Sequence, residues 1–85
     1  MKVKLLFFAS LRERLGAPGE ELDVPASVST VGALRDHLRA RGGAWAEVFA
    51  PTRNVRAAVN QDMVQPAAAI KTGDEVAFFP PVTGG

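Results

Sequence analysis

Residues 73–85 read Gly73-Asp74-Glu75-Val76-Ala77-Phe78-Phe79-Pro80-Pro81-Val82-Thr83-Gly84-Gly85. We predict a turn over residues 71–74 and the last strand of a sheet over residues 75–79. The two prolines that follow favour a stiff, extended run that leaves the sheet, because proline does not donate a hydrogen bond to a central ladder. The stretch therefore predicts a strand that continues into a flexible tail over residues 80–85.

The residues before this stretch predict the rest of the fold. Apolar runs and alternation indicate strands over residues 3–9, 20–24, 55–59 and 63–64. The main helix is predicted to begin at Thr30, with Ser29 or Thr30 as its cap, and to bury Val31, Leu34 and Leu38. Shorter helices are predicted over residues 10–15, capped by Ser10 and ended by Gly16, and over residues 44–50. This order predicts one α+β domain over residues 1–85, with a mixed sheet of about five strands and one main helix packed on one face. The β-grasp (ubiquitin-like) topology is the natural form of this arrangement.

Composition excludes several classes of function. The chain has no cysteine and a single histidine, His37, so we expect no metal site and no thiolate nucleophile. Its ten basic and nine acidic side chains leave a net charge of +1, without the basic excess typical of nucleic-acid binding. No apolar run approaches the length that crosses a bilayer. We therefore expect a cytoplasmic protein with no nucleic-acid or membrane partner.

Strand alternation leaves several large apolar side chains on the sheet face that the main helix does not cover. Lys2 and Lys4 mark this face as solvent in the first strand, and Glu75 marks it in the last. The predicted exposed residues are Leu6, Phe8 and Phe79, which Met63 joins if Val64 points inward. An apolar patch with a charged rim is typical of a protein–protein contact. We interpret five arginines on the predicted helices as a solvated surface that can bind an acidic partner: Arg12, Arg14, Arg35, Arg39 and Arg41. Of these, Arg12 belongs to the predicted contact.

The tail carries the predicted chemistry. Gly84 and Gly85 have no side chain and can enter a channel too narrow for a Cβ atom. Six extended residues, Pro80 to Gly85, span at most about 20 Å and can deliver the carboxylate of Gly85 to another protein's active site. A carboxylate is a poor electrophile until an oxygen becomes a leaving group, which a mixed anhydride with AMP provides.

The chain resembles the MoaD family of ubiquitin-like sulfur carriers, the small subunits of molybdopterin synthase. The resemblance spans nearly the whole sequence and is densest at residues 6–13, 57–61 and 73–85. It implies a β-grasp fold and a contact surface at Phe8, Met63 and Phe79. It also implies that a MoeB-like enzyme uses ATP to adenylate Gly85, after which a sulfur-delivery protein converts the acyl-adenylate into a thiocarboxylate.

The same resemblance implies where the sulfur goes. The tail would enter the large synthase subunit, in a complex of two large and two small subunits, and donate sulfur to a pyranopterin precursor of the molybdenum cofactor. The chain would bind no cofactor itself and would not be an enzyme on its own. Two alternatives share the fold and the tail. One is a ubiquitin-like modifier conjugated to lysines through Gly85, and the other is a thiamin-pathway sulfur carrier, which the longer chain and residues 7–9 and 78–81 disfavour.

Overall fold

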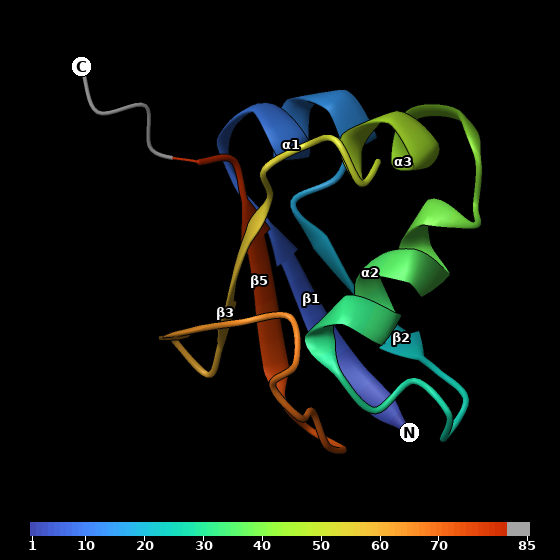
Figure 1. Cartoon of the computed structure of the whole chain (residues 1–85), viewed down its shortest axis with the longest axis vertical. Coiled ribbons are helices and arrows are strands. Elements are labelled where there is room, and N and C mark those ends of the chain that lie inside the picture. Colours follow the sequence, from blue (N-terminus) through green and yellow to red (C-terminus); the bar gives the residue numbers. More distant parts are fainter. Residues whose placement is uncertain (82–85) are drawn as a thin grey trace.

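The predicted strands pair into one mixed sheet in the computed structural model, which describes residues 1–81 (Figure 1). Along the chain the elements are β1 (Lys2–Phe7), α1 (Ala9–Leu15), β2 (Gly19–Asp23), α2 (Val31–Arg39), α3 (Gly43–Val48), β3 (Arg56–Val59), β4 (Asp62–Val64) and β5 (Glu75–Phe79). The strand order is β2-β1-β5-β3-β4, with β1 and β5 parallel and the other neighbours antiparallel. The last strand therefore lies in the middle of the sheet, and this confirms the predicted α+β arrangement.

Helix α2 covers one face of the sheet, while α1 and α3 lie near the carboxyl end of β5 (Figure 1). Of the two predicted caps, Thr30 is the one that caps α2, because its hydroxyl accepts a hydrogen bond from the backbone N–H of Ala33 at 3.1 Å. The predicted stripe of Val31, Leu34 and Leu38 is buried. Within residues 1–81, no helix is both long enough and apolar enough to span a bilayer.

The core follows the predicted alternation along β1 and β5. Val3, Leu5 and Phe7 point into the core from β1, and Val76 and Phe78 point into it from β5. Aromatic rings extend this core towards the helices. The ring of Phe49 meets Phe78 edge-on at 5.2 Å, and that of Trp45 meets Phe7 edge-on at 5.5 Å. Such edge-on pairs add to the stabilisation that burial alone provides.

The junction between β1 and α1 differs from the prediction. Ser10 does not cap α1, because the chain already turns at Ala9, which has φ +53°. Phe8 occupies the cap position with extended backbone, and no side chain caps the helix. The strand thus ends two residues earlier than predicted, but Phe8 keeps a strand-like backbone. Gly16 ends α1 in the left-handed conformation, as predicted.

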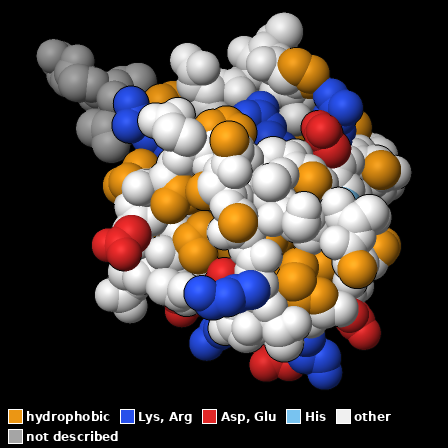
Figure 2. All heavy atoms as spheres, turned by 60° about the horizontal axis from the view of Figure 1, so that its bottom comes forward, with side chains coloured by type: hydrophobic (Ala, Val, Ile, Leu, Met, Phe, Trp, Pro, Cys, Tyr) orange, Lys and Arg blue, Asp and Glu red, His pale blue; other side chains and the backbone are white. Residues whose placement is uncertain are grey.

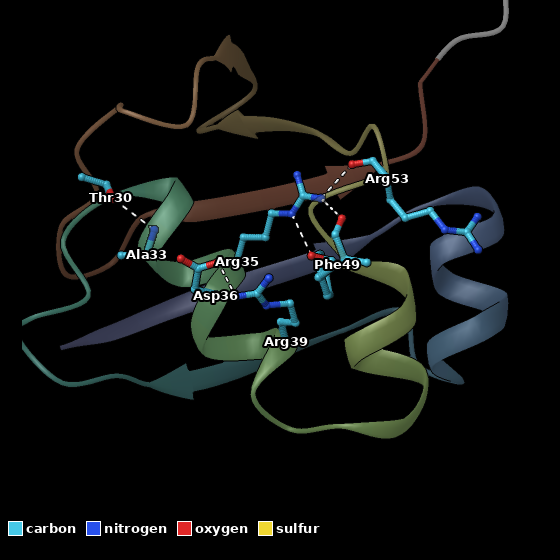
Figure 3. A network of polar contacts seen from close by, with 8 residues as sticks. Thr30, Ala33, Arg35, Asp36, Arg39, Phe49 and Arg53 are labelled. Carbon is cyan, nitrogen blue, oxygen red and sulfur yellow. Dashed lines mark hydrogen bonds and ion pairs between the residues drawn. The ribbon is translucent and has the colours of Figure 1, made fainter.

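Arg35 is a structural residue, contrary to its interpretation as part of a solvated surface. Its Nε–H donates to the carbonyl oxygen of Phe49 at 3.2 Å, and its Nη2 donates to those of Ala50 and Arg53 at 2.6 and 2.7 Å (Figure 3). Burial lowers the pKa of Arg35 below its ordinary value, but a guanidinium remains charged at neutral pH. The side chain therefore ties α2 to the segment that leads from α3 into β3. Residue spacing along α2 could not show that three carbonyl groups lie opposite this position.

A second polar network holds the start of β5 to the turn between β3 and β4. Asn60 and Gln61 form this two-residue turn, both with positive φ, as type I′ hairpin turns require. The Asn60 Nδ2 donates to Asp74 Oδ1 at 3.0 Å, and its Oδ1 accepts from the backbone N–H of Glu75 at 3.0 Å. The backbone N–H of Lys71 donates to Asp74 Oδ2 at 2.9 Å. Asp74 is 6% exposed, so this network satisfies a buried carboxylate and sets the register of β5.

This network predicts how stability depends on pH. The hydrogen bond from Asn60 lowers the pKa of Asp74 below its ordinary value of 3.8, and that from Lys71 adds to the effect. A lowered folded-state pKa stabilises the fold above 3.8, and this contribution is lost as the pH falls through the folded-state value. We expect Asp74→Asn to lower the free energy of unfolding by about 1–3 kcal/mol at neutral pH, because a donor then faces a donor.

Urea unfolding at neutral pH and well below pH 3.8 checks this expectation. The difference in the free energy of unfolding between Asp74→Asn and the wild type should be smaller at the lower pH, where the wild-type carboxyl takes up its proton. Asp62→Asn, which removes an exposed carboxylate from β4, is the matched control and should change little. An equal difference in the free energy of unfolding at both pH values would show that the charge of Asp74 does not contribute to stability.

Candidate functional site

The open face of the sheet carries a continuous apolar row that crosses all five strands. The register pairs Leu6 of β1 with Gly19 on one side and Ala77 on the other. Ala77 pairs with Ala58 of β3, and Ala58 pairs with Met63 of β4. Residues that pair directly across strands point to the same face, so these five residues lie side by side. At Gly19 a Cβ atom would overlap the carbonyl oxygen of Leu5, so this end of the row accepts no side chain.

The larger apolar side chains of this face stand around two buried alanines. Phe8 is 46% exposed and Met63 is 56% exposed, the two large hydrophobic residues recorded as exposed within residues 1–81. Leu6 and Phe79 are half-buried. All four apolar residues of the predicted contact thus lie on the open face, and Val64 points inward against the core, as the assignment of Met63 required. We call this surface the open-face patch: Leu6, Phe8, Ala58, Met63, Ala77 and Phe79.

Ala58 and Ala77 were not predicted as contact residues. Both are buried although they lie on the open face, because larger neighbours surround their small side chains. They lie between Leu6 and Met63 in the apolar row. Strand alignment by alternation does place both alanines on this face, so the signal was present in the sequence. What the sequence lacked was the register that brings them together.

Charged residues border the open-face patch at both ends of the strands. Away from the tail, Lys4 lies between Glu21 of β2 and Glu75 of β5. Nearer the tail, Arg56 pairs in register with Phe79. Exposed ion pairs contribute about 0–1 kcal/mol each, whereas a large apolar side chain buried by a partner contributes about 1.5–3 kcal/mol. The apolar residues can therefore supply most of the affinity, and the charges can orient the partner.

Arg12 lies one helical turn after Phe8 on α1, and it is exposed. Within residues 1–81 it takes part in no ion pair, so it is available to an acidic group on a partner. Three other arginines form ion pairs within the described part of this chain. Arg14 meets Glu47 at 3.4 Å, Arg39 meets Asp36 at 3.5 Å, and Arg41 donates to Glu20 at 2.6 Å. Arg41 also stacks over the ring of Trp45 at 4.4 Å.

The root of the tail adjoins the open-face patch. The backbone N–H of Phe8 donates to the carbonyl oxygen of Phe78 at 3.1 Å, which holds the end of β1 to the end of β5. Pro80 is half-buried and Pro81 is exposed. They border a pocket of about 290 Å³ whose other lining residues include Ser10, Arg14 and Arg53. The remaining predicted tail residues, Val82, Thr83, Gly84 and Gly85, lie outside the described residues.

Within residues 1–81, no three His, Asp or Glu side chains gather in a way that could hold a metal ion. The described part of the chain instead presents an apolar surface, the open-face patch, whose edge is the root of the tail. An exposed apolar surface of this kind can bind a protein surface.

Comparison with known proteins agrees with this arrangement. The model of the ThiS family matches residues 5–85. A molybdopterin synthase sulfur carrier subunit from Escherichia coli is 47% identical over 83 residues, which cover 98% of this chain and 99% of the relative. The crystal structure of small archaeal modifier protein 1 from Haloferax volcanii matches with a TM-score of 0.76 and 26% identity, over 95% of this chain and 98% of that one.

A third likeness bears on the fold alone. One chain of a complex between subunits 1 and 2 of the molybdopterin-converting factor from Helicobacter pylori matches with a TM-score of 0.68 at 21% identity, over 100% of both chains. These neighbours confirm the predicted ubiquitin-like β-grasp fold. The family model and the curated relatives confirm the resemblance drawn from the sequence, and the chain belongs to the ThiS family, together with the molybdopterin synthase sulfur carrier subunits that it resembles over nearly its whole length.

Proposed function

We propose that this chain is the sulfur carrier subunit of a molybdopterin synthase. One observation carries the proposal beyond the family: the open-face patch continues directly into the root of the tail. Phe79 belongs to the patch and is also the last residue of β5, followed at once by Pro80. A protein that docks on the patch therefore receives the tail at the edge of the same contact. The name of the E. coli relative supports the assignment.

The proposed chemistry takes place on the carboxylate of Gly85. A MoeB-like enzyme uses ATP, and a carboxylate oxygen attacks the α-phosphorus, so that pyrophosphate leaves and an acyl-adenylate forms. A sulfur-delivery protein then supplies sulfur at the oxidation level of sulfide, which attacks the acyl carbon; the bond from this carbon to the AMP oxygen breaks, AMP leaves, and a thiocarboxylate remains. The chain contributes recognition and reach, and the partners contribute the catalytic groups. It is thus not an enzyme on its own, and it binds no cofactor.

The proposed partner for sulfur donation is the large synthase subunit, in a complex of two large and two small subunits. Burial of Phe8 and Met63 would stabilise that complex, while Arg12 and Arg56 would orient it near the tail. Extended residues 80–85 span at most about 20 Å, so the pyranopterin precursor would lie within this distance of the contact surface. Two carriers would supply the two sulfur atoms of the dithiolene.

Intact mass spectrometry tests the proposal. The chain is incubated with the MoeB-like enzyme of its own organism, ATP and a sulfur source, and one oxygen should be replaced by one sulfur. Omission of ATP is the control and should leave the mass unchanged. The modified chain should then convert the pyranopterin precursor when the large subunit is added. An unchanged mass under complete conditions would contradict the proposal.

The likeness to small archaeal modifier protein 1 favours a second candidate function. In that case the activated Gly85 would form an isopeptide bond with lysines of other proteins. Cell extracts distinguish the two functions. Species of higher mass that carry this chain on lysine would support the modifier, whereas a stable complex with the large subunit and no such species would support the carrier.

A further inference from the structure

Met63 is the most exposed large hydrophobic residue recorded in residues 1–81, and it lies within the surface that the proposed function assigns to the partner. We infer that Met63 is a modification site, at which oxidation of its thioether by a peroxide weakens the binding of the large synthase subunit. The inference rests on the proposed function for its consequence. The preference for oxidation of Met63 over Met1 depends only on the structure of this chain.

The two methionines of the chain differ sharply in access. The chain has no cysteine, so Met1 and Met63 hold all of its sulfur before any is added to Gly85. Met1 packs against the core, and its side chain is only 15% exposed. Its ammonium group also donates to Asp23 Oδ1 and to the carbonyl oxygen of Val24, both at 3.0 Å. Met63 is 56% exposed and sits on a three-residue edge strand. Exposure favours oxidation, so a peroxide should reach Met63 first.

The position of Met63 makes oxidation consequential for binding. Met63 is the last residue of the apolar row, and its neighbour in the row is the small Ala58. A partner at this end of the row would therefore contact Met63 without a second large side chain from the row. Met63 also borders a groove of about 330 Å³ between α2 and the β3–β4 hairpin, whose other apolar lining includes Val31, Val55 and Pro66. Figure 2 shows hydrophobic side chains on the left, the side on which β3 lies in Figure 1, and further ones across the rest of this face. Met63 thus joins two apolar surfaces.

The chemistry needs only the peroxide. The sulfur lone pair attacks one peroxide oxygen, the O–O bond breaks, and the second oxygen leaves as water. Sulfur is oxidised by two electrons, and the peroxide is reduced. The product sulfoxide carries a strong hydrogen-bond acceptor, which a partner would have to desolvate without a designed donor. Methionine sulfoxide reductases reverse the oxidation, so the effect on binding is reversible.

Limited titration with hydrogen peroxide, followed by peptide mass mapping, tests the site. One oxygen should appear on Met63 well before any appears on Met1. Unfolding in urea before the titration should remove this preference, because both side chains are then accessible. Equal oxidation of the two methionines in the folded chain would overturn the assignment.

Binding to the large synthase subunit tests the consequence. The singly oxidised carrier should bind about tenfold more weakly or worse, and treatment with the reductases should restore the affinity. Met63→Leu removes the oxidisable sulfur, so its own affinity, measured before the treatment, should not change after the same exposure to peroxide. Unchanged affinity of the oxidised wild type, or equal loss by oxidised Met63→Leu, would overturn the inference. If the untreated carrier fails to bind the large subunit, the proposed function fails, while the order of oxidation still decides the modification site.

Discussion

Phe79→Asp should weaken binding of the large synthase subunit by about a hundredfold while the fold remains intact. Truncation of a central interface residue costs about 2–4 kcal/mol, and each 1.4 kcal/mol is about tenfold in affinity. A carboxylate adds the cost of desolvating a charge at the contact. The fold should tolerate it, because Phe79 is on the open face and only half-buried. Its register partner is Arg56, with which an aspartate can pair.

Titration of the large subunit with the variant measures this loss, and circular dichroism checks the fold. Thr72→Asp is the matched control, because it places the same charge on an exposed residue of the turn before β5, far along the strand from Phe79. The control should bind like the wild type. An unfolded Phe79→Asp variant would show that this residue belongs to the core, and a folded variant with unchanged affinity would show that the open-face patch is not the contact.

Deletion of Gly85 should abolish formation of the thiocarboxylate, with no measurable replacement of oxygen by sulfur in the intact mass. The deletion shortens the reach of the tail by about 3.5 Å and moves the carboxylate away from the nucleotide. The open-face patch is unaffected, so we expect affinity for the large subunit to change by less than about threefold. Gly85→Ala is a useful second variant. It retains the length and adds one methyl group, so it separates loss of reach from a channel too narrow for a Cβ atom.

The two changes should respond differently to concentration. Phe79→Asp weakens an equilibrium, so a large excess of the variant should restore much of the synthase activity by mass action. The Gly85 deletion removes the reacting atoms from their position, and no concentration of it should restore activity. Rescue of the deletion by excess protein would contradict the assignment of the chemistry to Gly85. Full sulfur transfer by the deletion at ordinary concentration would overturn the carrier function itself.

Local patterns of the sequence predicted the element types well, and they placed Leu6, Phe8, Met63 and Phe79 on the open face. A period of two along residues 2–8 separates the lysines, Leu6 and Phe8 from the buried residues, and the structure confirms this division. The main helix begins at its predicted cap for an equally local reason, a threonine hydroxyl within reach of an N–H three residues on. The structural role of Arg35 could not be predicted from local patterns. Its three acceptors lie 14 to 18 residues further along the chain, and only folding brings them to its side chain.

The sequence by itself determined the alternation of faces, the covalent attachment of a glycine-ended tail to the last strand, and the absence of thiol or multi-histidine chemistry. These depend on nearest neighbours and on composition. Only the tertiary structure decided that β5 inserts between β1 and β3, which brings Leu6, Ala77, Ala58 and Met63 into one row. Pairing between strands about seventy residues apart depends on register and burial across the whole sheet, because a shift of one residue would turn every side chain to the opposite face.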